Sequence, residues 1–525
     1  MSERHDLPVG WVMTRLDQVV SVNPKKLTPD CSPTDLFTFV PMPSVSEEFG
    51  GIDISTMRSL GEVQKGYTQF QAGDILFAKI TPCMENGKIA IVPELASVCG
   101  YGSTEFHVLR PYKGVAAKWV GYCLLQIGFR REARLNMTGS AGQLRVPKPW
   151  LEGREIPVAP SPEQKRIITK IEELFSNLDA GVAALERAKE NLKRYRASVL
   201  KAAVEGKLTE EWRKENPSTE PASRLLDRIL TERRKKWEAE QLAKYEAKGK
   251  KPPKGWRDKY KEPSTPDTSN LPELPEGWVW ATIEQICDHR PNALKAGPFG
   301  SSLKKNSYVE SGYKVYGQEQ VIRNDPYYGD YFITKEKYSS LNTCAVKPGD
   351  ILISLVGTIG RTLVLPDDSV PGVINPRLIK ASLNTELVIP KFIQLYFQSP
   401  HVAAIFKLVS HGGTMEILNM GTLKSLAFSI PPISEQMQIV RLTDQIQSLL
   451  ENQGYEFSEH LTGSSRLRQA ILKHAFEGKL VPQDPNDEPA SELLERIKAE
   501  QKNTAGKATQ QKSSRKKRKS KGGAG

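Results

Sequence analysis

Apolar residues recur every three or four positions from Ser161 to Gly206. They fall on the a and d positions of a heptad repeat, which are Ile171, Leu174, Leu178, Leu185, Ala188, Leu192, Tyr195, Val199 and Ala202. Ser161, Pro162 and Gln164 form a helix start with a capping serine, a first-turn proline and a capping-box glutamine. Gly206 supplies a residue that can end the helix in the left-handed conformation. The pattern predicts one long helix whose apolar stripe packs against another surface.

A second long helix is predicted from Ser434 to Gly478, with a weaker apolar stripe. Its seam keeps the apolar residues Ile446, Leu450, Phe457, Leu467 and Ile471, but polar residues stand on the seam at Gln453, His460 and Ser464. We expect a break or looser packing near Gly463, because polar side chains on a seam pack poorly.

The two helices are copies of each other, because the phrases around them occur twice in the chain. "LKAAVEGKL" at Leu200 returns as "LKHAFEGKL" at Leu472, and the "EQ" pair at Glu163 returns at Glu435, both with an offset of 272 residues. "LPVGW" and "AGDILF" also return, as "LPEGW" and "PGDILI", with offsets of 267 and 276. The length between "EQ" and "GKL" is therefore constant while the flanking regions have changed length.

This duplication predicts the architecture of the chain. If one helix leaves the first globular region and the other returns from the second, the pair is antiparallel and the molecule is a pseudo-twofold dumbbell. Helices of this length extend for roughly 65 Å at 1.5 Å per residue, so they would act as a ruler.

The globular regions are predicted to be mixed α/β domains. Strand-like runs such as "DILFAKI", "FHVLRP", "DILISLV" and "GVINPRLIKASL" are followed by helical patterns at "AKWVGYCLLQIGFRREARL" and "KFIQLYFQSPHVAAIFKLV". We expect globular domains at 1–160 and 271–432, long helices at 161–208 and 433–480, a charged helix and linker at 209–270, and a short helix with a disordered basic tail at 481–525.

The charge of the chain indicates an acidic polymer as partner. The 525 residues carry a formal net charge of +13, and no acidic residue follows Glu500. The lysines and arginines of the tail account for nine of these charges, so the tail is expected to tether nucleic acid without sequence preference.

Six cysteines without a Cys-x-x-Cys pair argue against a zinc site and a disulfide framework. The amino terminus lacks the apolar segment of a signal peptide, and no apolar run is long enough to span a membrane. We expect a cytoplasmic protein without a metal.

The sequence lacks recognisable catalytic motifs. It has no phosphate-binding loop with the Walker pattern, no Asp/Asn-Pro-Pro-aromatic motif of amino-methyltransferases and no identifiable catalytic triad. The repeated "EGK" imitates half of a nuclease site, but its position at the end of both helices favours a structural role. The chain is therefore predicted to be a non-catalytic, two-headed binder without a cofactor of its own.

Candidate nucleic-acid contacts in the second globular region lie in glycine-containing loops. "LKAGPFGSSLKKNSY" combines exposed backbone N–H groups with Lys295, Lys304 and Lys305, a composition that suits either a phosphate contact or an ordinary surface turn. Arg361 in "GTIGR" follows a strand, where a guanidinium can read guanine or hold a phosphate. Arg377 in "INPRL" and His411 in "SHGGTMEILN" complete this set.

The first globular region has comparable loops. "KITPCMENGK" follows the strand "GDILF" and offers Lys79, Asn86 and Lys88, although Asn86-Gly87 alone is also typical of a hairpin turn. "NMTGSAGQLR" offers Gln143 and Arg145 before the last strand.

Taken together, these motifs resemble the specificity subunits of type I restriction-modification systems. The resemblance extends from Leu7 to Ile497 and rests on the "LPxGW" openings, "GDILFAKITPCMENGKIA", "GSTEFHVLRP", "GPFGSSL", "INPRL" and the paired helices. It implies that each head is a target recognition domain for one half of a bipartite asymmetric sequence in double-stranded DNA. It also implies that the helices set the gap and dock two methyltransferase subunits, which carry S-adenosylmethionine. A separate restriction and translocase subunit would use ATP and Mg²⁺.

Two other classes remain open from the residues alone. One is a stand-alone nucleic-acid-binding scaffold, for example one associated with RNA, which would prefer A-form or single-stranded RNA to a B-form duplex. The other is an enzyme whose site lacks recognisable motifs, which an assay of the isolated chain would reveal.

Overall fold

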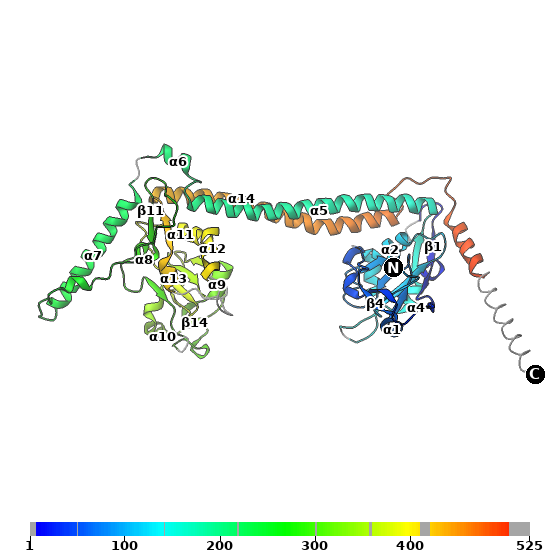
Figure 1. Cartoon of the computed structure of the whole chain (residues 1–525), viewed down its shortest axis with the longest axis horizontal. Coiled ribbons are helices and arrows are strands. Elements are labelled where there is room, and N and C mark those ends of the chain that lie inside the picture. The colour runs from blue at the N-terminus through cyan, green and yellow to red at the C-terminus, as the bar shows by residue number, and fades with distance from the viewer. Residues whose placement is uncertain are drawn as a thin grey trace, which may run out of the picture. The chain divides into compact units, whose positions relative to one another are not determined.

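The computed structural model describes residues 7–49, 51–140, 142–217, 220–299, 302–355, 360–409 and 420–502. The chain divides into two compact units (Figure 1). The first contains residues 1–186 and 458–525, and the second contains residues 187–457. Each long helix contributes one half to each unit. The predicted combination of mixed α/β regions and two long paired helices is confirmed.

The first unit contains two four-stranded sheets and a two-stranded ribbon. One sheet has the order β2 (Val20–Val22), β9 (Phe106–Pro111), β6 (Ile75–Ala78), β7 (Ile89–Ile91). The other has the order β4 (Met57–Ser59), β3 (Leu36–Val40), β8 (Gly100–Gly102), β5 (Thr68–Phe70). The ribbon pairs β1 (Val12–Arg15) with β10 (Glu155–Val158). The central strand β6 is apolar and buried along its whole length, since both of its faces are covered.

The second unit repeats this topology strand for strand. Its first sheet has the order β12 (Leu294–Ala296), β19 (Leu378–Ala381), β16 (Ile351–Ser354), β17 (Thr362–Val364). Its second sheet has the order β14 (Phe332–Ile333), β13 (Tyr313–Tyr316), β18 (Gly372–Ile374), β15 (Ala345–Val346), and its ribbon pairs β11 (Val279–Thr282) with β20 (Ala427–Ile430). The predicted strand "GVINPRLIKASL" is two strands, β18 and β19, because Asn375 and Pro376 turn the chain between them.

Short helices cover the sheets. In the first unit they are α1 (Leu60–Val63), α2 (Ala117–Leu125), α3 (Ile127–Leu135) and α4 (Lys148–Gly153). In the second unit they are α8 (Ile283–Ile286), α9 (Gln318–Arg323), α10 (Lys335–Ser340), α11 (Pro390–Gln398), α12 (Pro400–Val409) and α13 (Met420–Ser425). The segment after the first long helix contains α6 (Glu210–Glu215) and the 25-residue α7 (Ala222–Glu246), which extends away from the sheets (Figure 1). Each of the two helical patterns predicted from the sequence therefore forms two helices, α2 and α3 in the first unit and α11 and α12 in the second. The helices of each pair are divided at a residue with an extended backbone, Gln126 or Ser399.

The long helices are α5 (Ser161–Val204) and α14 (Ile433–Phe476). In the first unit Phe175 and Asp179 of α5 contact Arg468 of α14, and the apolar core includes Ile171 together with Leu472. In the second unit Leu200 and Ala203 of α5 share a core with Ile439 of α14. Within each unit the beginning of one helix therefore lies beside the end of the other, so the paired halves are antiparallel (Figure 1).

The predicted break near Gly463 is wrong, because α14 is continuous through this residue. One glycine costs only about 1 kcal/mol in a helix, which the flanking hydrogen-bonded turns sustain. The packing there is nevertheless loose, since no described residue of α14 between Thr443 and Ile471 is fully buried.

The repeated phrases meet in space at one junction in each unit. Trp11 of "LPVGW" donates its indole N–H to Glu163 Oε2 at 3.0 Å, and Trp278 of "LPEGW" donates to Glu435 Oε2 at 2.9 Å. Both glutamates are 1% exposed. The opening of each globular region is therefore joined to the first turn of a long helix.

The glycines that end the helices belong to the same junctions. Gly206 and Gly478 have φ values of 74° and 68°, as predicted for helix ends. A Cβ atom would lie 2.5 Å from Pro275 Cγ in the second unit and 2.3 Å from Pro8 Cγ in the first. The "EGKL" and "LPxGW" phrases recur together because each glycine must leave room for the proline of the other phrase.

The first unit is expected to lose stability below about pH 6.5 because of His107. This side chain is 4% exposed; its Nε2 lies 2.9 Å from the carbonyl oxygen of Val146, and its Nδ1 lies 3.0 Å from Asn23 Nδ2. One donor and one acceptor fit a neutral ring. Burial lowers the pKa of His107 below its ordinary value of 6.5, against the opposing effect of the Val146 hydrogen bond.

Below pH 6.5 the unfolded chain therefore binds a proton that the folded unit does not, so the free energy of unfolding falls by up to about 1.4 kcal/mol per pH unit. Hydrogen exchange of first-unit peptides between pH 7 and 5, corrected for the intrinsic rate, measures this slope. His107→Gln should flatten it, and an unchanged slope in that variant would assign the acid sensitivity to another group.

Candidate nucleic-acid interface

The strand register gives the equivalent positions of the two heads. Ile75 of β6 pairs with Ile91 and Leu109, and Ile351 of β16 pairs with Val364 and Ala381. Counting along the strands from these pairs, Lys88 corresponds to Arg361, and Glu105 corresponds to Arg377. These equivalent positions surround the carboxyl ends of β6 and β16. The loops that the sequence analysis selected as candidate contacts begin at these ends.

In the second head Arg361 and Arg377 flank the end of β16. The amide of Ser354 donates to the Arg361 carbonyl oxygen at 2.9 Å, and the amide of Leu355 donates to the Arg377 carbonyl oxygen at 2.9 Å. Both side chains are exposed. The backbone thus holds both arginines while their side chains extend into solvent.

The arginine side chains make only weak contacts within the protein. Arg361 Nη1 donates to the Ile322 carbonyl oxygen at 3.2 Å, and Arg377 Nη1 donates to Gln318 Oε1 at 3.4 Å. Gln318 Nε2 in turn donates to Ser354 Oγ at 2.9 Å. Within the described residues neither guanidinium is paired with a carboxylate. Their remaining N–H groups are available for phosphates or base edges.

The sequence analysis missed an aromatic loop in the second head. Tyr327, Tyr328 and Tyr331 are 52%, 38% and 41% exposed. Lys314 Nζ, from a buried lysine of β13, donates to the carbonyl oxygens of Tyr327 and Gly329 at 2.8 and 3.1 Å, so the loop is anchored from beneath.

The anchored loop adds polar and stacking groups to the head. Gln320 donates to the Tyr328 carbonyl oxygen at 2.7 Å, and the Arg323 guanidinium carbon lies 4.1 Å from the centre of the Tyr328 ring. Gln320 and Arg323 belong to α9, whose first residue, Gln318, contacts Arg377. The tyrosine-rich phrase "DPYYGDY" was the available sequence signal, since exposed aromatic residues beside arginine are typical of nucleic-acid surfaces.

The lysines predicted in this head are more dispersed. Lys295 is half-buried in β12, opposite Lys380 of β19. Lys304 is exposed. Lys305 begins the short helix η6 (Lys305–Ser307). The predicted contact His411 lies outside the described residues.

In the first head Lys79 and Arg145 come together at the end of β6. The amide of Val146 donates to the Lys79 carbonyl oxygen at 2.9 Å, and the Lys79 amide donates to the Glu105 carbonyl oxygen at 2.9 Å. Arg145 forms a bidentate ion pair with Glu105, with both N···O distances at 2.8 Å. Gln143 is exposed, and its backbone carbonyl oxygen accepts a hydrogen bond from Arg145 Nη1 at 3.0 Å. The Arg145 guanidinium is therefore largely occupied by the protein.

The ionisation of this cluster follows from its contacts. Burial lowers the pKa of Lys79, and the attraction of Glu105 opposes this effect. The hydrogen bond from Arg145 lowers the pKa of Glu105 and raises that of Arg145. The cluster therefore presents the partly buried ammonium of Lys79 beside the ion pair of Arg145 with Glu105. The second head instead presents two exposed arginines at this end of its central strand.

Asn86 and Lys88 lie on the neighbouring turn. Asn86 is exposed and donates from Nδ2 to Glu47 Oε1 at 2.7 Å. Lys88 is half-buried and directs Nζ toward the Met42 carbonyl oxygen at 3.5 Å. The two heads therefore carry different side chains on equivalent frameworks.

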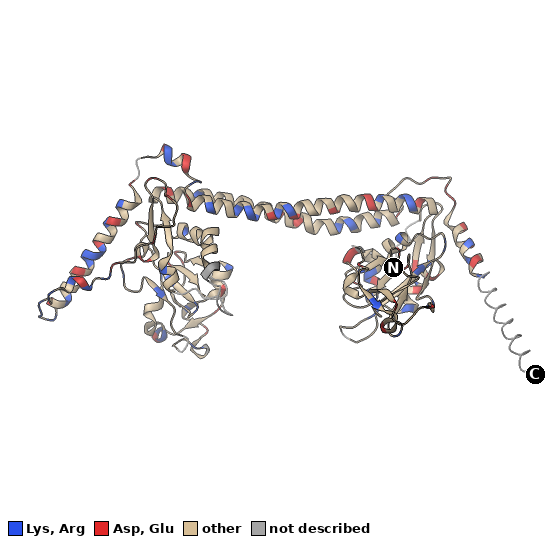
Figure 2. Ribbon diagram, viewed as in Figure 1, with Lys and Arg blue, Asp and Glu red and all other residues tan. Residues whose placement is uncertain are grey.

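Charged residues of both signs alternate along the helices. Figure 2 shows Lys and Arg interspersed with Asp and Glu along α7 and along both long helices. Such mixed charge favours solubility and ion pairs, not a continuous track for a phosphate backbone.

The described residues provide neither a metal-binding group nor a membrane-spanning helix. No group of three His, Cys, Asp or Glu side chains there is arranged to hold a metal ion. None of the described helices combines the length and the apolar character required to cross a bilayer.

Comparison with known proteins agrees with the fold. Residues 275–456 match the family described as "Type I restriction modification DNA specificity domain". The EcoAI specificity subunit of Escherichia coli is 28% identical over 492 residues, covering 84% of this chain and 78% of the relative. The EcoEI specificity subunit of the same species is 28% identical over 510 residues, covering 85% and 80%.

Two solved structures share the fold. A chain from a study of complex assembly and conformational transition of the type I R-M system has a TM-score of 0.62 at 18% identity, covering 90% of this chain and 99% of that one. The HsdS subunit from Thermoanaerobacter tengcongensis has a TM-score of 0.54 at 18% identity, covering 91% and 99%.

Duplicated α/β heads on paired long helices, together with these matches, are the features of a DNA-recognition protein. Residues 275–456 are similar to the DNA specificity domain of type I restriction-modification systems, and the predicted resemblance of the chain to the specificity subunits of these systems is confirmed.

Proposed function

We propose that each head reads one half of a bipartite, asymmetric target in double-stranded DNA. The two heads would be residues 1–160 and 271–432. The observation that carries the proposal is the different chemistry at equivalent positions of the two sheets, with Arg361 and Arg377 in one head and Lys88 and Glu105 in the other. Exposed arginines favour guanine, whereas a carboxylate and shielded ammonium groups present another pattern of donors and acceptors. An identical framework with different reading groups accounts for an asymmetric target.

In this proposal α5 and α14 set the gap between the half-sites. The length from "EQ" to "GKL" is the same in both copies, and α5 and α14 each contain 44 residues. An unchanged length is what a spacing element requires, since a change of one residue in one helix would put its apolar seam out of phase with the partner helix.

The helices would also dock two methyltransferase subunits. Tyr195 of α5 and Leu449 and Tyr455 of α14 are 55%, 64% and 69% exposed. Three large apolar side chains exposed on two helices of the second unit fit contact with a protein partner. The methyltransferases would bring S-adenosylmethionine, and a restriction and translocase subunit would use ATP and Mg²⁺. The assembly would act in the cytoplasm.

Adding seven residues to each long helix, after Leu185 and after Phe457, should lengthen the spacer of the target. One heptad keeps the apolar seam in phase and extends each helix by about 10 Å, or roughly three base pairs. The half-site sequences should stay the same, because the heads are unchanged. Reconstitution with the methyltransferase subunits of the same system, followed by mapping of methylated adenines, measures both quantities.

The added heptad also rotates one half-site by about 100° around the duplex. The efficiency of methylation can therefore fall while the new spacing is used. The isolated chain is the control and should not methylate DNA. Methylation at the original spacing with normal efficiency would refute the ruler. Preference for A-form RNA over duplex DNA would refute the DNA-reading function as a whole.

A further inference from the structure

The buried aspartate at the start of the central strand has an ion-pair partner in the first head only. Asp74, which precedes β6, accepts from Arg110 Nε at Oδ1 and from Arg110 Nη2 at Oδ2, both at 2.7 Å. The strand register places Asp350 and Ser382 at the equivalent positions of the second head. A serine therefore stands where the first head has the arginine.

The equivalence of the two aspartates extends to their backbone contacts. Asp74 Oδ2 accepts from the Gln71 amide at 2.7 Å, and Asp350 Oδ2 accepts from the Lys347 amide at 2.9 Å. Asp350 also accepts a hydrogen bond from the Ser382 hydroxyl. It is only 3% exposed, and no ion pair joins it to a basic side chain in the described part of the chain.

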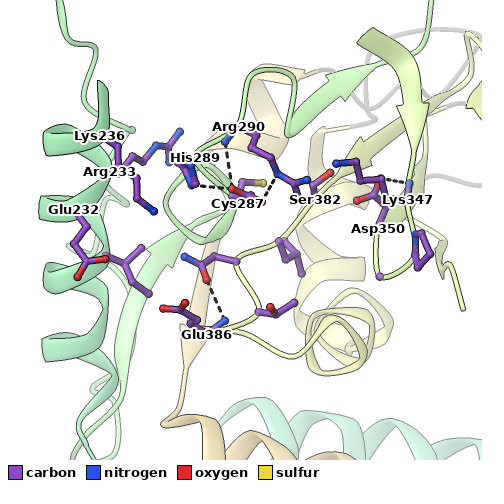
Figure 3. Close-up of a pocket in the computed structure, with 17 residues that line it drawn as sticks. Glu232, Arg233, Lys236, Cys287, His289, Arg290, Lys347, Asp350, Ser382 and Glu386 are labelled. Carbon is purple, nitrogen blue, oxygen red and sulfur yellow. Dashed lines mark hydrogen bonds and ion pairs between the residues drawn. The ribbon is translucent and has the colours of Figure 1, made fainter. Parts of the chain in front are cut away.

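A cavity of about 310 Å³ adjoins this carboxylate (Figure 3). Asp350 and Ser382 lie on one side of it, and Arg233 and Lys236 of α7 lie on the other. Liquid water occupies about 30 Å³ per molecule, so the space is ample for an arginine-sized group. The replacement of an arginine by a serine leaves the position of the missing guanidinium open.

The basic residues around the cavity are partly engaged elsewhere. Arg290 forms an ion pair with Asp288 at 2.5 Å, and Arg233 donates to the Glu284 carbonyl oxygen at 2.9 Å. The lining contains four Lys or Arg and four Asp or Glu side chains, so its formal charge does not select the sign of a ligand. The charges of Lys380 and Arg290 act on the Asp350 carboxylate, but neither side chain forms an ion pair with it in the described part of the chain. A bidentate guanidinium would supply the direct contact that Arg110 makes with Asp74, so the carboxylate selects a planar cation.

We propose that this cavity is a binding site for an alkylguanidinium group, as carried by an arginine side chain. The incoming guanidinium would form with Asp350 the bidentate pair that Arg110 forms with Asp74. The site lies at the amino end of β16, whereas Arg361 and Arg377 surround its carboxyl end. It is therefore separate from the DNA-reading cluster. Burial raises the pKa of the Asp350 carboxyl, and the Ser382 hydrogen bond opposes this effect.

Titration of the full-length chain with ethylguanidinium at constant ionic strength tests the site. Calorimetry or ligand-observed NMR should show saturable binding with a Kd on the order of 1–10 mM, as expected for a small fragment. Ethylammonium should bind at least about fivefold more weakly, because it cannot form the bidentate pair. Asp350→Asn should weaken ethylguanidinium binding by at least about tenfold, since it removes the charge and keeps the shape.

A variant in the cavity and one outside it complete the test. Ser382→Arg places the missing guanidinium in the cavity, and it should abolish ethylguanidinium binding and raise the melting temperature by about 2–4 °C. Ser340→Ala, at an exposed residue of α10 outside the cavity lining, is the control and should bind as the unaltered chain does. If Ser382→Arg lowers the melting temperature, Asp350→Asn decides the question alone. Absence of saturable binding, unchanged binding in Asp350→Asn, or equal binding of ethylammonium would overturn the proposal.

A second arm distinguishes the sources of the guanidinium, and it alone rests on the proposed function. Ethylguanidinium is titrated into the chain assembled with its methyltransferase subunits. Loss of binding in the assembly identifies an arginine of the partner protein, whereas unchanged binding identifies a small guanidinium compound. The isolated chain needs no DNA for the first arm, so a failure of DNA recognition and a failure of this site are separately visible.

Discussion

Replacing Arg361 and Arg377 together with alanine is expected to lower the affinity of the assembled complex for its specific duplex by about 10²- to 10³-fold. Each arginine is exposed at the end of β16 without a carboxylate partner among the described residues, and each such contact to a base contributes ~1–3 kcal/mol. Competition between the specific duplex and a scrambled one measures the loss. Mapping of methylated adenines should show that one half-site is relaxed and the other is still read.

The matched control removes two positive charges from the opposite end of the same strand. Arg290 and Lys347 are exposed near Asp350, at the amino end of β16. Their double replacement by alanine changes the net charge equally and should leave the discrimination between half-site sequences intact. Equal losses in both double variants would mean that only net charge matters, and the reading role of Arg361 and Arg377 would be abandoned.

Replacing Glu435 with alanine should lower the free energy of unfolding of the second unit by about 3–5 kcal/mol, because it leaves a largely buried arginine unpaired. Glu435 accepts hydrogen bonds from Thr209 at 2.7 Å, from Arg213 at 2.8 and 3.0 Å, and from Trp278 at 2.9 Å. The Arg213 side chain is 21% exposed. Hydrogen exchange of peptides from each unit measures the loss separately, which a two-unit chain requires.

The first unit provides a matched control at Glu163. Its Oε2 accepts from Trp11, its Oε1 lacks a partner within the described residues, and its neighbour Arg166 is paired with Asp487. Burial raises the pKa of Glu163, with the Trp11 hydrogen bond opposing the effect. Glu163→Ala should therefore destabilise its unit less than Glu435→Ala does.

A double replacement isolates the ion pair at the second junction. If Arg213→Ala is added to Glu435→Ala, part of the loss should be recovered, because the unpaired guanidinium is gone. An additive result would show that Arg213 and Glu435 do not stabilise the junction as a pair.

The sequence by itself determined the features that depend on local periodicity. The duplication, the two long helices, their glycine ends and the strands after "GDIL" could be predicted, because apolar spacing and turn residues act over a few positions. Loops rich in lysine, arginine and glycine also located the ends of β6 and β16. Arg361 and Arg377 lie where the predicted loops place them.

Tertiary structure alone decided which of these residues pair. Glu105 and Arg145 are 40 positions apart, and their ion pair occupies a guanidinium that the sequence offered to DNA. The local pattern near Gly463 indicated a break that helix hydrogen bonding removes. The buried side chains of Lys314 and Gln320 anchor the tyrosine loop in the second head, and Gln318 joins the head through Ser354. Asp350 lacks the ion pair of Asp74 because Ser382, a residue 32 positions away, occupies the position of Arg110 in the strand register. Such contacts depend on how strands align, and one sequence contains no local signal for alignment between distant segments.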